Sequence, residues 1–268
     1  MLMYMVICSV SLVVAALTLV CGFGLGTILT PAFAFFFPLD IAIAATAIVH
    51  LANNLFKLIL VGRYVRLRVL WPFIAGAIPA AIAGAFLLQW LSTHQLAEPL
   101  MQYQAFGKTY SILMLNLVIG GLLMAFALIE FIPGFDQWAV HQRWVWVGGV
   151  LSGFFGGLSG NQGALRAAFL IRTGLTKEEF VGTSAAASVV VDCVRLAIYF
   201  SSFFLAKVAL ISDSKGLWLV VGASLAAFVG SYLGSLLIKK MTIKAVKIAV
   251  AVMVFALGGA MAAGLLGK

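Results

Sequence analysis

Long apolar runs separated by short polar segments make up almost the whole sequence, and this pattern restricts the fold more than any other feature. The runs are Met3–Val20, Thr27–Phe37, Ile41–Val61, Trp71–Leu91, Tyr110–Phe131, Val145–Leu158, Ala164–Ile171, Phe180–Leu205, Leu217–Ile238 and Ala245–Leu266. Most have the length of a transmembrane helix, which needs ~20 apolar residues, and they lack the short alternating pattern of barrel strands. We therefore predict an all-α integral membrane protein that contacts membrane lipids.

The composition excludes a water-soluble globule. Hydrophobic residues make up 64% of the chain and charged residues only 9%, whereas soluble domains carry about 25% charged residues. The net charge of +9 comes from Lys and Arg in short clusters between apolar runs, where such charges orient a membrane protein. We expect no nucleic-acid partner.

Two of the runs are too short to span a membrane, and each follows a glycine-rich break. Thr27–Phe37 follows the break at Cys21–Gly26, and Ala164–Ile171 follows the break at Gly156–Gly163. A single helix over the first pair of runs would be ~52 Å long, well beyond a hydrocarbon core of ~30 Å. The sequence therefore predicts a re-entrant hairpin at each break.

The basic residues favour this hairpin topology. If each pair of runs crossed the membrane once, the positive charges would divide evenly between the two sides, against the positive-inside rule. Two hairpins instead place most of them in the cytoplasm: Arg63, Arg66, Arg68, Arg143, Arg172, Lys177, Lys239, Lys240, Lys244 and Lys247. The loops or tail on the other side then hold Lys108, Lys207, Lys215 and Lys268.

Each half of the chain then contains one hairpin and three crossings. Because that number is odd, the halves, 1–140 and 141–268, form two inverted repeats, and both chain ends lie outside the cytoplasm. A stripe of small residues also recurs: Gly76, Ala77, Ala80, Ala81 and Gly84 correspond to Gly222, Ala223, Ala226, Ala227 and Gly230. Such stripes allow close helix packing, whereas inverted repeats with broken helices are typical of secondary transporters.

The breaks are candidate anion sites, because unwound backbone inside a membrane is tolerated where protein or a water-filled cavity satisfies it. Helices that begin there aim free N–H groups and a positive dipole at a ligand. Amide and guanidinium groups at the second break suit an oxyanion. The candidate substrate-binding residues are Gly24, Gly26, Thr46, Gly160, Asn161, Gln162, Gly163, Arg166, Thr183 and Ser184. Arg166 can alternatively extend to the cytoplasmic headgroups.

Polar side chains also follow one face of the helix after each break. In the first half His50, Asn53, Asn54 and Lys57 form one stripe, which should face the bundle; Lys57 lies near enough to the cytoplasmic end to extend to the headgroups. In the second half Asp192 and Arg195 are three residues apart and should pair. His50 and Asp192 are candidates for proton coupling, and a structural hydrogen bond from His50 to another helix is the alternative.

No enzyme motif stands out. The chain lacks HExxH, GxSxG and P-loop patterns, and Cys8, Cys21 and Cys193 lie within apolar runs without metal-ligand spacing. We expect no enzymatic activity, no metal and no cofactor. The longest segment outside the predicted helices, Ser92–Thr109, is short for a separate domain.

Two segments carry the most specific patterns of the chain, GFGLGTILTPAFAFFFPLDIAIAATA and GGLSGNQGALRAAFLIRTGLTKEEFVGTSAAASVVVDCVRLAIYF. They resemble the sulfite exporter TauE/SafE family of small bacterial anion permeases with two similar halves. The resemblance covers nearly the whole chain. It implies ion-driven transport of a small anionic substrate, such as sulfite or an organosulfonate, across the bacterial inner membrane. The second-half motif of the family falls on Gly160, Asn161, Gln162, Gly163, Arg166, Thr183 and Ser184.

Two other classes of function fit the same sequence. An anion channel would use the site as a filter without alternating access, and a membrane assembly or chaperone subunit would not transport at all. The sequence does not specify the substrate, the direction of transport, the coupling ion or the oligomeric state.

Overall fold

The computed structural model describes residues 1–21, 24–94, 99–105, 107–131, 142–171, 173–201, 214–237 and 243–266. Of the basic residues used to predict the topology, Arg172, Lys207, Lys239, Lys240 and Lys268 lie outside these residues, as do the side chains of Lys215, Lys244 and Lys247. The predicted boundary between the halves, at residue 140, also lies outside them.

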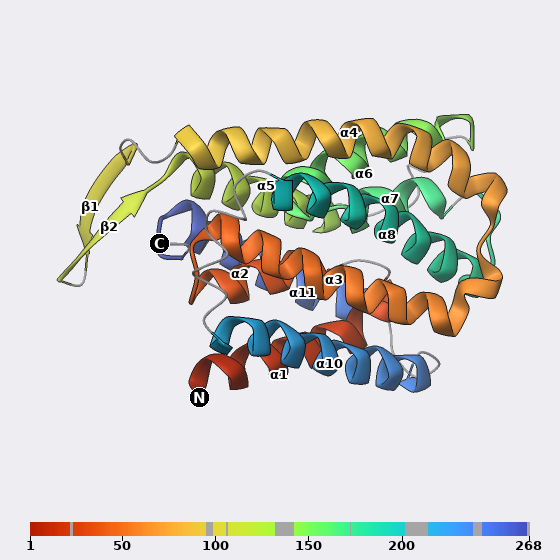
Figure 1. Ribbon diagram of the computed structural model, residues 1–268, viewed down its shortest axis with the longest axis horizontal. Helices are drawn as coiled ribbons and strands as arrows, with labels where there is room; N and C mark the ends of the chain where they lie inside the picture. Colours follow the sequence, from red (N-terminus) through yellow and green to blue (C-terminus); the bar gives the residue numbers. More distant parts are fainter. Residues whose placement is uncertain are drawn as a thin grey trace.

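The chain forms an elongated bundle of helices (Figure 1). In the first half these are α1 (Leu2–Cys21), α2 (Leu25–Ala34), α3 (Leu39–Val61), α4 (Leu67–His94) and α5 (Met114–Phe131). In the second half they are α6 (Val145–Ser159), α7 (Gly163–Leu170), α8 (Lys177–Ser201), α10 (Ser214–Leu237) and α11 (Ile243–Ala262). One-turn 3-10 helices lie at Gly62–Tyr64 and Gln142–Trp144. Each predicted apolar run contains one helix, so the helical part of the prediction is confirmed.

A β-hairpin is the one departure from an all-helical chain among the described residues. Strands β1 (Met101–Ala105) and β2 (Lys108–Ile112) pair antiparallel across Gly107, where the sequence predicts a loop and then the first turn of a helix from Tyr110. Tyr103 and Tyr110 face each other across the strands and stack with ring centroids 5.5 Å apart. The Tyr103 hydroxyl donates to the carbonyl of Ala263, 2.7 Å away. Because cross-strand aromatic pairing holds Tyr110 in a strand, α5 begins only at Met114.

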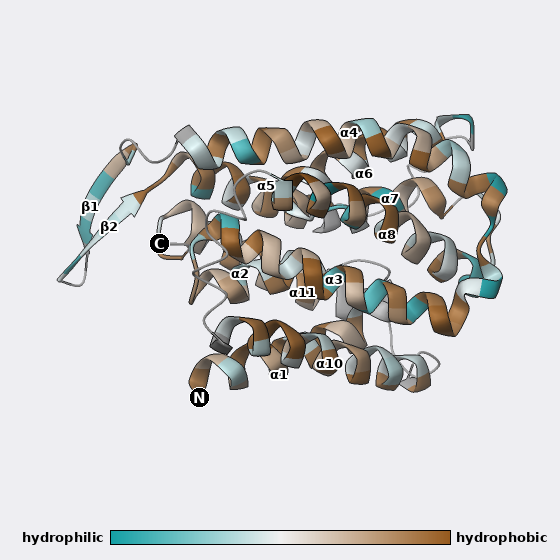
Figure 2. Ribbon diagram, in the orientation of Figure 1, coloured by the Kyte–Doolittle hydropathy of each residue, from teal (hydrophilic) through white to brown (hydrophobic). Residues whose placement is uncertain are grey.

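The exterior of the bundle is apolar. Exposed side chains include Ile59 (82% exposed), Trp218 (67%) and Trp71 (63%), and Figure 2 shows apolar residues along most of the helices. In the described part of the chain, four helices are long and apolar enough to cross a membrane, with spans at Leu39–Tyr64, Leu67–Thr93, Lys177–Ser201 and Gly216–Leu236. Such a surface suits lipid and would be costly in water, so the prediction of a helical membrane protein is supported.

Helices of the two halves pack reciprocally. The fourth helix of the first half, α4, packs against the first helix of the second half, α6. In the same way α10 of the second half packs against α1. The equivalent helices α5 and α11 pack against each other, and so do α3 and α8. Exchanging the halves therefore reproduces the main helix contacts.

The small-residue stripes make two of these interfaces. A Cβ atom at Gly76 would collide with the carbonyl of Trp146, and one at Gly84 with the carbonyl of Phe154, both on α6. In the other interface, a Cβ atom at Gly230 of α10 would collide with the carbonyl of Leu12 on α1. The prediction that the stripes serve close helix packing is confirmed.

A capping box begins α8 and connects it to the first half. The backbone N–H of Thr176 donates to the Glu179 carboxylate (3.0 Å), and the N–H of Glu179 donates to the Thr176 hydroxyl (3.3 Å). Glu179 also pairs with Arg66 from the α3–α4 connection, whose Nε lies 2.6 Å from the carboxylate. The connection after α3 and the start of α8 therefore lie at the same end of the bundle, and both chain ends lie at the opposite end (Figure 1).

Candidate functional site

The helices are interrupted at both of the glycine-rich breaks that the sequence predicts. Gly24, with φ 116°, precedes α2, and Gly160, with φ 80°, ends α6. Both angles lie in the left-handed region, which glycine enters without a steric penalty. The helices that follow are short: α2 has 10 residues and α7 has 8. At ~1.5 Å per residue neither exceeds ~15 Å, about half of a hydrocarbon core.

The breaks meet inside the bundle. A Cβ atom at Gly26 would lie 3.1 Å from the carbonyl oxygen of Gly160, so the backbones of the first and second breaks touch. A Cβ atom at Gly24 would lie 2.9 Å from Thr18 Cγ2. The absence of a side chain at Gly26 allows the two halves to approach each other at this point, and the absence of one at Gly24 leaves room for Thr18 of α1.

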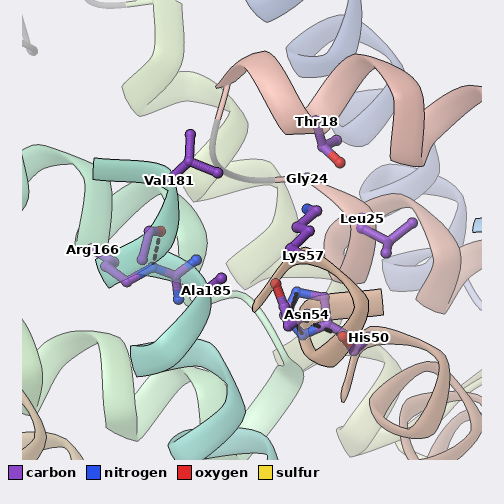
Figure 3. A pocket seen from close by; sticks show the side chains of 10 residues that line it. Thr18, Gly24, Leu25, His50, Asn54, Lys57, Arg166, Val181 and Ala185 are labelled. Atoms are coloured by element: carbon purple, nitrogen blue, oxygen red, sulfur yellow. Dashed lines mark hydrogen bonds between the residues drawn. The ribbon is translucent and has the colours of Figure 1, made fainter. Parts of the chain in front are cut away.

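A cavity lies beside this contact (Figure 3). Both halves of the chain line it, through α1, α2 and α3 on one side and α7 and α8 on the other. The lining residues are Thr18, Gly24, Leu25, His50, Asn54, Lys57, Arg166, Val181, Ser184 and Ala185. Lys57 and Arg166 bring positive charge, and none of the described lining residues is a carboxylate.

Arg166 is buried on the α7 side of the cavity, with 3% of its surface exposed. Its Nε donates to the Ser184 hydroxyl at 2.7 Å, and its Nη1 donates to Gln162 Oε1 at 3.2 Å. Gln162 in turn donates from Nε2 to Asp192 Oδ1 at 3.0 Å. The predicted site residues Gln162, Arg166 and Ser184 are thus brought together, and Arg166 points into the bundle instead of toward the headgroups.

Asp192 of α8 binds residues of α3 and of its own helix, in addition to Gln162. Its Oδ2 accepts a hydrogen bond from His50 Nδ1 of α3, 2.6 Å away. Its Oδ1 lies 2.8 Å from Arg195 Nη2 and 3.0 Å from Arg195 Nε. The predicted pair of Asp192 and Arg195 is confirmed. His50 makes the hydrogen bond to a neighbouring helix that the sequence left as one of two alternatives, so its imidazole is held between the cavity and a buried carboxylate.

Lys57 does not extend to the headgroups, and that prediction is wrong. Its side chain is 9% exposed and lines the cavity. The reason is the direction of the polar stripe: His50, Asn53 and Asn54 are buried with it, because this face of α3 packs toward α8 and α10. The prediction that the stripe faces the bundle is therefore confirmed. Lys57, the last residue of the stripe, is buried on the same side of α3 as the others.

A second cavity lies on the other side of Gly24, between the second break and helices α5 and α11. Its lining residues are Gly24, Thr27, Phe126, Ala127, Asn161, Gly163, Ala164, Val250, Ala251 and Val254. Asn161 is 5% exposed, and neither atom of its side-chain amide has a hydrogen-bond partner among the described residues. Gly24 lines both cavities, so the two are neighbours.

Five of the predicted site residues line neither cavity: Gly26, Thr46, Gly160, Gln162 and Thr183. The Thr183 hydroxyl accepts a hydrogen bond from the backbone N–H of Arg66 (3.0 Å), so it fastens the connection after α3 to α8. Thr46 is fully buried, and its hydroxyl has no partner in the described part of the chain. Sequence reasoning also missed Thr18 and Val181, which line the first cavity; each belongs to an apolar run and carries no signal of its own.

The apolar exterior, the paired helices and the buried polar cavity define a multi-pass helical membrane protein with an internal site. A family model described as Sulfite exporter TauE/SafE matches residues 7–261. The chain belongs to this family and is a membrane transporter of the sulfite-exporter type. No match is found among curated proteins or among solved structures.

Proposed function

We propose that the protein is a secondary transporter that moves a small sulfur-containing oxyanion, such as sulfite or an organosulfonate, across the bacterial inner membrane. The observation that carries this proposal is Arg166, a buried guanidinium on a cavity that both halves line. A guanidinium presents N–H groups in a fork that matches oxyanions. Charged side chains inside a membrane bundle commonly mark the substrate pathway.

The proposed mechanism is alternating access between inverted repeats. The reciprocal packing of α4 on α6 and of α10 on α1 supports two equivalent halves. The pairing of Arg66 with Glu179 supports the re-entrant topology, because single crossings would put the Arg63 loop and Lys177 on opposite sides of the membrane. The contact of Gly26 with Gly160 supports a site where the broken helices meet, as is typical of such transporters.

His50 and Asp192 are the proposed proton carriers. They form a hydrogen bond of 2.6 Å next to the cavity, and His50 itself lines it. A histidine can change its charge near neutral pH, so the arrival of an anion can be coupled to that of a proton. Gln162, which donates to Asp192 and accepts from Arg166, connects the substrate side to the proton side.

A binding experiment tests the proposal. Sulfite, thiosulfate, sulfate, taurine and sulfoacetate are compared by the rise in melting temperature of the detergent-purified protein, since a ligand of the folded state stabilises it. We expect at least one sulfur oxyanion to raise the melting temperature and Arg166→Gln to abolish the rise. The matched control is Arg68→Gln, because Arg68 is exposed. Unchanged binding in Arg166→Gln would remove the proposed site.

Flux in proteoliposomes separates the proposed transporter from the other two classes. A carrier saturates with substrate and shows counterflow, whereas a channel follows the electrical gradient without counterflow. An assembly or chaperone subunit would show no flux, and any ligand binding would not depend on Asn161, Gln162 and Arg166.

A further inference from the structure

Lys57 is a buried lysine on the cavity wall, and the proposed function above gives it no role. The described part of the chain supplies neither a carboxylate nor any other hydrogen-bond acceptor to its ammonium group. An ammonium group taken out of water without a partner is costly. Its position on the cavity, 9% exposed, therefore points to a ligand that carries the missing negative charge.

The carboxylate next to the cavity already has hydrogen-bond donors on both of its oxygens. Asp192 does not line the cavity, and its two oxygens accept from His50, Gln162 and Arg195. The ionisable side chains of the lining are Lys57, Arg166 and His50, all of them basic. A ligand in this cavity thus meets a lysine and an arginine and, among the described lining residues, no carboxylate.

The two cations come from different halves of the chain and lie on different walls. Lys57 is on α3 and Arg166 is on α7, and Figure 3 shows the two side chains among those that line the cavity. An anion held there touches both walls at once. An anion with a single negative charge would neutralise one of the two cations and leave the other buried without a partner. An anion with two negative charges would neutralise both Lys57 and Arg166.

We propose, resting on the proposed function, that Lys57 is a specificity-determining residue that makes the site select doubly charged oxyanions over singly charged ones. Arg166 recognises the oxyanion group itself, which every candidate substrate shares. Lys57 binds the second negative charge, which only some of the candidate substrates carry. Zwitterionic substrates are disfavoured for the same reason, because their ammonium group would lie near a cation.

Thiosulfate and methanesulfonate test this proposal as a matched pair of probes. Both have a sulfur atom with three oxygens and one further substituent, but thiosulfate carries two negative charges and methanesulfonate one. Affinities are measured by titration calorimetry on the purified full-length protein and on the variants Lys57→Gln and Lys57→Arg. Lys177→Gln is the control for loss of a lysine, since Lys177 is exposed.

We expect the wild-type protein to bind thiosulfate about tenfold or more tightly than methanesulfonate, as a charge-assisted hydrogen bond predicts. Lys57→Gln should remove most of this preference by weakening thiosulfate, with methanesulfonate changed less than about twofold. Lys57→Arg and Lys177→Gln should keep the preference. Retention of a binding signal for methanesulfonate shows that Lys57→Gln is folded.

Two results overturn the proposal. One is equal affinity of the wild-type protein for the two probes, and the other is an unchanged preference in Lys57→Gln. Either would leave the proposed function intact as long as Arg166→Gln still abolishes binding. If the wild-type protein bound none of the anions, the proposed function itself would be overturned, and with it the role of Lys57.

Discussion

His50 Nδ1 and Asp192 Oδ2 lie 2.6 Å apart, and their hydrogen bond joins α3 of the first half to α8 of the second. The two residues are 142 positions apart in the chain and meet because α3 and α8 pack against each other. The bond thus connects the halves at the level of the cavity.

Replacing His50 with Gln should separate binding from proton coupling. Glutamine retains a hydrogen-bond donor for Asp192 but cannot take up a proton, so we expect anion binding to persist while anion-dependent proton movement stops. The measurement is the internal pH of proteoliposomes, followed with a trapped fluorescent dye during anion uptake. Proton movement at the wild-type rate in His50→Gln would rule out the proposed role.

Loss of the Asp192 carboxylate should destabilise the protein strongly. Asp192→Asn leaves the fully buried Arg195 guanidinium without its anion, and breaking a buried pair from one side typically costs about 3–5 kcal/mol. Thermal unfolding in detergent measures the effect. The double variant Asp192→Asn/Arg195→Gln should recover part of the loss, because it removes the orphaned charge as well. A double variant less stable than the single one would contradict this account.

Gly24→Ala should impair both stability and anion binding. The residue has φ 116°, where a side chain costs about 1–2 kcal/mol, and its Cβ would lie 2.9 Å from Thr18 Cγ2 on the cavity wall. Gly107→Ala is the matched control, because Gly107 has φ 71° but no atom within 4 Å of the added carbon. Melting temperature and anion affinity should fall for Gly24→Ala, and only the melting temperature for Gly107→Ala.

Neighbouring glycines in α5 should respond differently to the same substitution. A Cβ at Gly120 would lie 2.5 Å from the carbonyl of Gly258 on α11, whereas a Cβ at Gly121 meets nothing within 4 Å. We expect Gly120→Ala to destabilise the protein by about 1–3 kcal/mol through overpacking, and Gly121→Ala to be neutral or stabilising by about 0.5–1 kcal/mol. Thermal unfolding of both variants under one condition decides the point, and equal effects would exclude α5–α11 contact.

Cysteine labelling in intact cells tests the re-entrant topology. Single cysteines at Arg63, Lys177 and Lys108 are introduced after the three native cysteines are replaced by alanine. The hairpin topology predicts that an impermeant maleimide reaches Lys108→Cys from outside and spares the other two. Labelling of Lys177→Cys from outside would contradict it, as would a cytoplasmic reporter fused after Lys268.

The apolar runs were sufficient to place the helices. For α3 the predicted run Ile41–Val61 and the observed helix Leu39–Val61 agree to within two residues, because a membrane helix must satisfy its own backbone and therefore shows its length in the sequence. The β-hairpin at Met101–Ile112 was missed, since its pairing depends on cross-strand contacts and on the Tyr103 bond to Ala263. The bond to Ala263 joins residues 160 positions apart, which no local pattern records.

The candidate site was only partly visible before the fold was known. Arg166, Gln162 and Ser184 stood out as polar residues in apolar runs, and the structure brings them together. Thr183, one position before Ser184, points instead to the backbone of Arg66. A helix turns by about 100° per residue, so adjacent residues face different neighbours, and only the packing shows which neighbour each one meets.

The sequence by itself determined that this chain is a helical membrane protein with two broken helices and a polar stripe on α3, because burial of apolar runs in lipid and the left-handed backbone at Gly24 and Gly160 are local requirements. The tertiary structure decided that the breaks touch, that Asp192 binds His50, and that Lys57 turns inward and lines one cavity together with Arg166. These relationships join residues from both halves, and they depend on packing and electrostatics between helices that no local pattern records.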